Sequence, residues 1–299
     1  MLTPLILAGK RLEQLLNPGW PGDTALEVGV VSRRRLRGSS GQVYYLYVPR
    51  SAGKKPPLMV SVHGGARNAR QHALLLSTMA ERYGVVLLAP LFSNKQFPDY
   101  QRLGRSGCAQ RSDLALDRVI AEVGDLTGAD VGRFFLFGYA EGGQFAHRYA
   151  MVHPERVAGA VIGAAGWQSA QQEGASHVDK AGVCRDLPGM RFDTGKFLQI
   201  PMTVVVGDQE TDPAPRANEL ALIDVRQGDD HLEHAQRWAR TMNLVARSHG
   251  LPAHFRVEMI PGLDYSFEHG IARGAMHRKI FAHLFDNPHC CTSELSAQA

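Results

Sequence analysis

The chain has 299 residues, of which 44% are hydrophobic and 21% charged, with 31 glycines and 16 prolines. This composition is typical of a globular protein and excludes disordered, collagen-like and coiled-coil chains. The 33 lysines and arginines exceed the 29 acidic residues by only four charges, so a nucleic-acid partner is not expected. At this length we expect one domain over residues 1–299.

The N-terminal segment is apolar but has no positive charge before it and is too short to span a bilayer. We predict an amphipathic docking helix over residues 1–22, with a secretion signal as the alternative. Four cysteines are too few for a disulfide framework: Cys108, Cys184, Cys290 and Cys291. We therefore expect free thiols, a cytoplasmic protein without a membrane partner, and a polar tail over residues 286–299.

The elements then alternate along the chain. A basic cluster at residues 33–37 lies in an alternating segment that favours a solvated hairpin over a polyanion site. Apolar or β-branched runs predict strands over 42–49, 58–63, 85–90, 133–138, 157–163, 202–207 and 254–260. Helical spacing predicts helices over 68–83, 112–126, 142–153, 231–248 and 267–285. The class is doubly wound α/β with a mostly parallel sheet, whose ligands bind beyond the carboxyl ends of the strands.

One such strand end carries the segment FGYAEGG, Phe137–Gly143. Glycines stand two residues before and two residues after Ala140, which is the spacing of a sharp turn from strand to helix. In the nucleophile elbow GxSxG the middle residue is pushed into the pocket, and small neighbours let the helix pack closely. Here the middle residue is alanine.

With these residues the chain resembles the α/β hydrolase superfamily, in particular bacterial esterases of the poly(3-hydroxybutyrate) depolymerase and feruloyl esterase type. The resemblance covers residues 42–285. The segment VSVHGGARNA looks like the family's oxyanion loop, and FGYAEGG with the helix that follows looks like its elbow. The segments VVVGDQETDP and IPGLDYSF look like its acid and histidine loops. Four segments in the family's order imply the fold, whereas activity depends on the site.

At that site the chain departs from the family pattern. The resemblance places the nucleophile at Ala140 and the histidine at Tyr265, and it places the acid at Glu210, with Asp208 and Asp212 as near alternatives. Loss of a triad serine or histidine costs on the order of a million-fold in turnover. A tyrosine is a poor replacement for imidazole, because its pKa of about 10 is far from neutral.

The electrostatic half of the site is retained in the sequence. The resemblance implies an oxyanion loop that presents backbone N–H groups, with the N–H of Glu141 opposite, and it predicts binding of a small carbonyl or carboxylate ligand. The residues concerned are His63, Gly64, Gly65, Ala66 and Tyr139. We expect the Glu141 side chain to point away from Ala140, as a solvated or helix N-terminal carboxylate.

Three further features have both functional and ordinary structural interpretations. His269 lies one helical turn beyond Tyr265, so its ring is a candidate for the same pocket, although a surface histidine is more common. The stretch 167–200 is a candidate lid, with Trp167 lining the pocket or packed in the core. The acidic and histidine residues at 229–234 lack metal-ligand spacing and favour a capped helix start, so no metal or other cofactor is expected.

Three hypotheses about function follow from the sequence. The first is an α/β hydrolase fold that has lost the serine triad, and whose pocket binds a small carbonyl, carboxylate or ester ligand or serves as a partner surface. The second is an enzyme of changed chemistry, a lyase, cyclase or isomerase, that uses Tyr265 with Glu210 or Asp212. The third is an ester hydrolase carrying an inactivating Ser→Ala change at position 140. The oligomeric state stays open.

Overall fold

The structure of the chain is a computed structural model that describes residues 26–39, 41–104, 110–164, 192–208, 231–263 and 266–289. The expected docking helix over 1–22, residues 167–191 of the candidate lid and residues 290–299 of the tail lie outside these ranges. None of the helices that are described is long and apolar enough to cross a membrane.

In this part of the chain eight strands form one sheet in the order β1-β2-β4-β3-β5-β6-β7-β8. They are β1 Val31–Arg35, β2 Val43–Tyr47, β3 Pro57–Val62, β4 Val86–Leu91, β5 Asp130–Tyr139, β6 Val157–Gly163, β7 Met202–Gly207 and β8 Phe255–Ile260. Strand β2 runs antiparallel to β1 and β4, and all other neighbours are parallel. The predicted mostly parallel sheet is confirmed.

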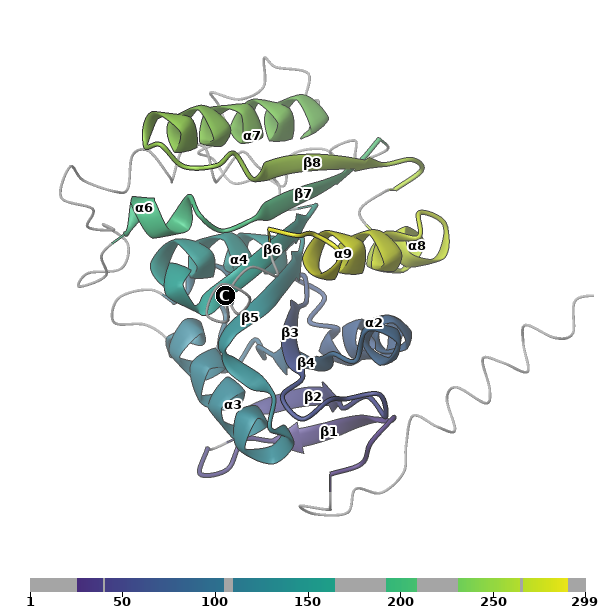
Figure 1. Cartoon of the computed structure of the whole chain (residues 1–299). Helices are drawn as coiled ribbons and strands as arrows, with labels where there is room; N and C mark the ends of the chain where they lie inside the picture. Colours follow the sequence, from purple (N-terminus) through teal and green to yellow (C-terminus); the bar gives the residue numbers. More distant parts are fainter. Residues whose placement is uncertain are drawn as a thin grey trace, which may run out of the picture.

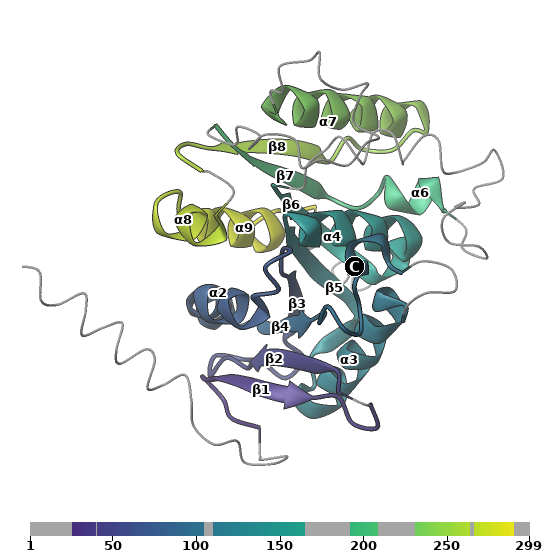
Figure 2. The same cartoon turned by 180° about the vertical axis from the view of Figure 1, so that it is seen from behind.

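Helices cover both faces of this sheet (Figures 1 and 2). They are α2 Ala69–Tyr83, α3 Ser112–Thr127, α4 Glu141–Val152, α6 Thr194–Phe197, α7 His231–Ser248, α8 Phe267–Ala272 and α9 Met276–Phe285, with short 3-10 turns at Tyr100–Arg102 and Pro154–Arg156. Helices α3, α4 and α7 contribute to one buried apolar cluster, and α2, α8 and α9 contribute to a second. Two cores of this kind explain why the central strands are apolar on both faces.

The basic segment at the N-terminal edge forms the expected hairpin. Strand β1 pairs with β2 so that Arg34 lies opposite Tyr44 and Arg33 opposite Tyr45. The arginines are exposed or half-buried along this edge strand. Charged residues on an edge strand discourage pairing with other chains.

The last helix differs from its prediction. The sequence pattern indicates one helix over 267–285, whereas the structure has α8 and α9 with a break between them. Ala275 adopts a left-handed backbone with φ 48°. A Cβ atom at Gly274 would lie 2.3 Å from Cγ2 of Ile260, so the chain passes too close to β8 for a regular helix with side chains there. The break is therefore a packing effect that the periodicity does not report.

Candidate functional site

The turn from β5 into α4 has the geometry of a nucleophile elbow. Ala140, at its apex, has φ 52° and ψ −121°, a region that residues other than glycine rarely occupy. Its N–H donates to the carbonyl oxygen of Gly163 at 2.9 Å, and its own carbonyl accepts from Gly143 at 2.8 Å. The apex that presents a hydroxyl in GxSxG presents a methyl group here.

Two glycines allow this turn because backbone crosses backbone there. A Cβ atom at Gly138 would lie 1.9 Å from the carbonyl oxygen of Gly142, and one at Gly142 would lie 2.2 Å from that of Val62. Neither position has room for any side chain. The first turn of α4 therefore lies directly against the ends of β3 and β5, and the elbow is a requirement of packing as well as of chemistry.

The loop after β3 is anchored by His63, whose side chain is fully buried. Its Nε2 atom accepts from the Phe92 N–H at 3.1 Å, so Nδ1 carries the proton and donates to the Gly64 carbonyl at 2.8 Å. Burial lowers the pKa of His63 to about 4, and the ring is neutral at pH 7. This imidazole positions the loop from inside the protein.

Arg67 ties the same loop to the segment that follows β4. Its guanidinium donates to the carbonyls of Phe92, Phe97 and Pro98 and to Oδ1 of Asn94. It also lies 5.0 Å above the ring centre of Tyr100, a cation–π distance. No sequence pattern points to a role for this residue, since its partners come from a distant segment.

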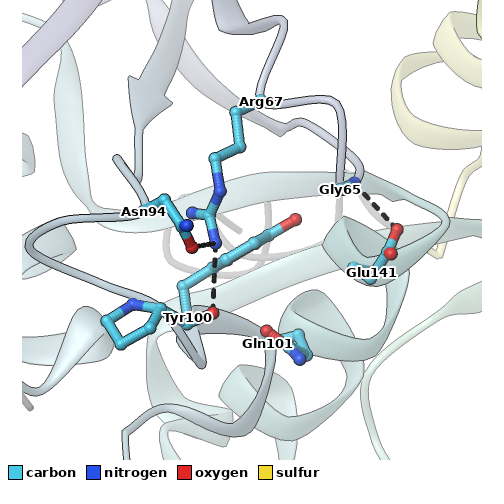
Figure 3. A pocket seen from close by; sticks show the side chains of 7 residues that line it. Gly65, Arg67, Asn94, Tyr100, Gln101 and Glu141 are labelled. Atoms are coloured by element: carbon cyan, nitrogen blue, oxygen red, sulfur yellow. Dashed lines mark hydrogen bonds between the residues drawn. The ribbon is translucent and has the colours of Figure 1, made fainter.

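Glu141 departs from the expectation of a solvated carboxylate. Its Oε2 atom accepts a hydrogen bond from the Gly65 N–H at 2.8 Å (Figure 3). A Cβ atom at Gly65 would lie 2.5 Å from Oε1, so only glycine admits the carboxylate at this distance. The backbone donor that the resemblance assigns to an oxyanion is thus satisfied by the chain itself, because the start of α4 brings Glu141 across from the loop.

A pocket of about 400 Å³ opens beside this contact (Figure 3). Its described lining consists of Gly65, Arg67, Asn94, Pro98, Tyr100, Gln101 and Glu141. None of these seven is a serine, threonine, cysteine or histidine. The Tyr100 hydroxyl is not available as a nucleophile, because it donates to the His63 carbonyl at 2.6 Å and burial raises its pKa.

The remaining candidates divide between described and undescribed residues. Ala66 is exposed on the loop, whereas Tyr139 is buried and packs on Phe267 at 5.5 Å between ring centres, so it belongs to the core. His269 is half-buried on α8, and its N–H donates to Oγ of Ser266 at 3.3 Å. Glu210, Asp212, Tyr265 and Trp167 lie outside the described residues.

The segments that follow β7 and β8, which correspond to the acid and histidine loops, contact each other directly beyond the strand ends. Oδ1 of Asp208 accepts from the Gly262 N–H at 2.6 Å. A Cβ atom at Gly207 would lie 2.0 Å from the Leu263 carbonyl oxygen, which shows how closely the two loops approach. Asp208, one of the near alternatives for the acid, therefore binds backbone here. Within the described ranges no three histidine, cysteine, aspartate or glutamate side chains gather as metal ligands.

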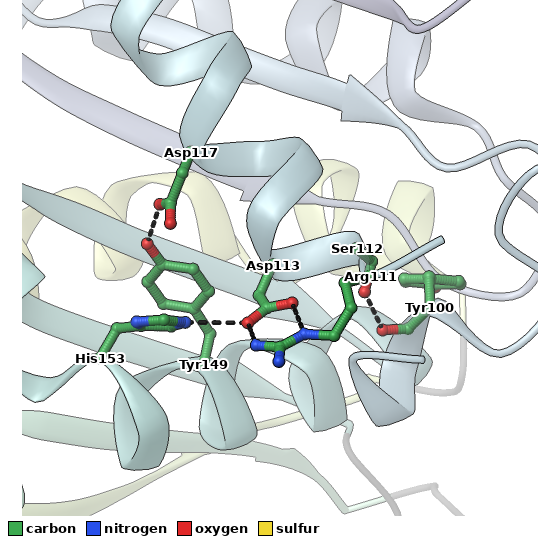
Figure 4. A network of polar contacts seen from close by, with 7 residues as sticks. All are labelled: Tyr100, Arg111, Ser112, Asp113, Asp117, Tyr149 and His153. Atoms are coloured by element: carbon green, nitrogen blue, oxygen red, sulfur yellow. Dashed lines mark hydrogen bonds and ion pairs between the residues drawn. The ribbon is translucent and has the colours of Figure 1, made fainter. Parts of the chain in front are cut away.

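A polar network adjoins Tyr100, one of the residues that line the pocket (Figure 4). Ser112 Oγ donates to the Tyr100 carbonyl at 2.9 Å. The adjacent Asp113 carboxylate is buried, accepts from Nε of Arg111 at 2.8 Å and lies 2.9 Å from Nε2 of His153. Burial acts to raise the pKa of Asp113, but the hydrogen bonds from Arg111 and His153 outweigh it and lower the pKa to about 2. The network joins the start of α3 to the end of α4.

Comparison with known proteins supports the fold. No protein-family model and no curated protein sequence matches the chain. Solved structures do: poly(aspartic acid) hydrolase-1 from Sphingomonas sp. KT-1 is 19% identical with a TM-score of 0.65, over 86% of this chain and all of that one. The poly(3-hydroxybutyrate) depolymerase LpqC from Bordetella parapertussis is 22% identical with a TM-score of 0.64, over 89% of this chain and 96% of that one.

An S-formylglutathione hydrolase from Agrobacterium tumefaciens is 16% identical with a TM-score of 0.55, over 85% of this chain and 93% of that one. These identities are low, so the likeness concerns the fold. The chain has the α/β hydrolase fold, as the sequence resemblance implied.

The elbow geometry makes a prediction about stability. Gly138→Ala forces a methyl group into the Gly142 backbone, and we expect it to lower the free energy of unfolding by about 3 kcal/mol. Gly53→Ala is the control, because no atom lies within 4 Å of a Cβ there. Urea unfolding should show a change below about 0.5 kcal/mol for the control. Equal stability of the two variants would contradict the close backbone approach.

The Asp113 network makes a prediction about pH. The pKa of Asp113 is lower in the folded chain than the value of about 3.9 in an unfolded one, so its ionisation stabilises the fold at pH 7. This contribution, about 2 kcal/mol, is complete above about pH 5 and is lost progressively as the pH falls to about 1. Asp113→Asn should remove it at pH 7, whereas Asp125→Asn, at an exposed position of α3, should not. Denaturant unfolding at pH 7 and pH 3 measures both variants.

Proposed function

Given an α/β hydrolase fold whose elbow carries no hydroxyl, we propose that this protein binds a small carbonyl compound, free or as an ester, without hydrolysing it by the serine mechanism. The observation that carries the proposal is the methyl group of Ala140 at the strained apex between β5 and α4. In hydrolases of this fold the residue at this apex is the nucleophile, and acyl transfer by the serine mechanism needs one there.

The described pocket offers no replacement for the missing serine. Its carboxylate, Glu141, is bound to the Gly65 N–H, and its phenol, Tyr100, is bound to a carbonyl. Loss of a triad nucleophile leaves roughly a thousand-fold residual acceleration from binding and the oxyanion hole. We expect even less residual activity here, because the Gly65 N–H, a candidate oxyanion donor, is already bound to Glu141.

The same contact bears on the ligand. A carboxylate ligand would approach the Glu141 carboxylate and meet a like charge, which is unfavourable at short range. A neutral carbonyl group carries no such penalty. Of the two ligand classes that the sequence suggests, the carbonyl compound is therefore the one we propose.

Labelling with a fluorophosphonate probe tests the absence of catalysis. We expect no covalent adduct in the intact mass of the natural chain and no turnover of p-nitrophenyl butyrate, since no hydroxyl stands at position 140. A burst of p-nitrophenol from the natural chain would overturn the proposal. If steady turnover without a burst disappears in Tyr265→Phe, the changed chemistry of the second hypothesis would replace it.

Stepwise restoration of the triad tests the reason for the loss. Ala140→Ser alone should remain unlabelled, because the resemblance places tyrosine where the base is needed. Ala140→Ser with Tyr265→His should label slowly. Adding Glu141→Gly should raise the labelling rate by about 100-fold, because it frees the Gly65 donor for the developing oxyanion. Rapid labelling of the single variant would show that another base, such as His269, serves the site.

A further inference from the structure

The second oxygen of Glu141 distinguishes this pocket from an oxyanion site. Oε2 is bound to the Gly65 N–H, while Oε1 has no hydrogen-bond partner among the described residues. Glu141 is half-buried and forms part of the pocket lining. A carboxylate oxygen that lines a cavity without a donor is an acceptor for a ligand.

Arg67, the one cation in the described lining, does not neutralise this charge at close range. In Figure 3 its guanidinium points towards Asn94, away from the contact between Gly65 and Glu141. Four hydrogen bonds to carbonyl-type oxygens and the ring of Tyr100 hold it there. Arg67 keeps its charge, but these contacts direct most of its N–H groups to oxygens of the protein. Glu141 is therefore the charged residue of the described lining that has an oxygen without a hydrogen-bond partner among the described residues.

Neutral hydrogen-bonding groups stand beside that charge. Gln101 lines the pocket with its side-chain amide, and Asn94, whose Oδ1 is bound to Arg67, keeps its amide nitrogen as a donor. A carbonyl group can accept from such amides. The lining thus combines donors for a carbonyl oxygen with an acceptor for a cationic group.

We propose that the ligand of this pocket is a small carbonyl compound that also carries a primary ammonium group, with Glu141 as its counter-ion. The inference rests on the proposed function and adds the charge of the ligand to it. Glu141 then has two roles: Oε2 closes the oxyanion hole, and Oε1 selects a cation. Ligands of the same size and opposite charge are excluded.

Three amides that share a propionyl carbonyl and differ in the group at the third carbon, which sets their charge, test the inference. They are β-alaninamide, propionamide and succinamic acid, which are positive, neutral and negative at pH 7. Titrations followed by the 15N–1H signal of Gly65 should give affinities in that order, with at least ten-fold between the positive and the negative compound. Added salt should reduce this preference.

Variants locate the charge effect. Glu141→Gln keeps an oxygen for the Gly65 N–H but removes the charge, so we expect the preference for β-alaninamide over propionamide to fall by at least five-fold. Glu155→Gln removes the same charge at an exposed site in the turn Pro154–Arg156 and should leave the preference unchanged.

The outcomes separate this inference from the proposed function. The ammonium ligand would be overturned by equal binding of the three amides, by a preference for succinamic acid, or by binding of none of them. With equal binding or a preference for succinamic acid, the proposed binding without hydrolysis would still stand. Turnover of an ester with a burst would instead overturn the proposed function, whatever the charge preference.

Discussion

The structure around the site depends on one backbone turn, in which Ala140 holds φ 52° and ψ −121° between β5 and α4. Strain of this kind costs of order 1–3 kcal/mol and persists only where the surroundings fix it. Here Gly138 and Gly142 bring backbone against backbone, which leaves the turn no alternative path. The elbow geometry does not depend on a hydroxyl at its apex, because the turn also sets how α4 packs on the sheet.

Glu141 shows how a single position next to that turn changes the character of the site. The residue after the apex begins α4, and its side chain reaches the loop after β3, where Gly65 donates to it. In a hydrolase the same N–H serves the transition state. In this chain the carboxylate of Glu141 accepts from this donor, and its second oxygen has no hydrogen-bond partner among the described residues.

Polar contacts of residues in the lining and behind it hold the pocket wall in place. Neutral His63 and the guanidinium of Arg67 fasten the loop after β3 to the segment after β4. Ser112, at the start of α3, binds the carbonyl of Tyr100, and the neighbouring Asp113 joins α3 to His153 at the end of α4. Buried polar groups with all their partners in place hold one geometry, since any displacement leaves a donor or acceptor unpaired. These contacts therefore hold the described part of the pocket wall in one geometry.

The sequence by itself determined the sheet, the order of its elements and the elbow, because these follow from local patterns. Strands β6 and β7 and helix α7 have the predicted bounds, and the glycine spacing around Ala140 predicted the turn. It did not determine the break before Met276, the site on Gly65 that Glu141 occupies, or the roles of Arg67 and Tyr100. Those contacts join residues up to 76 positions apart, and only the packing of the folded chain decides which distant groups meet.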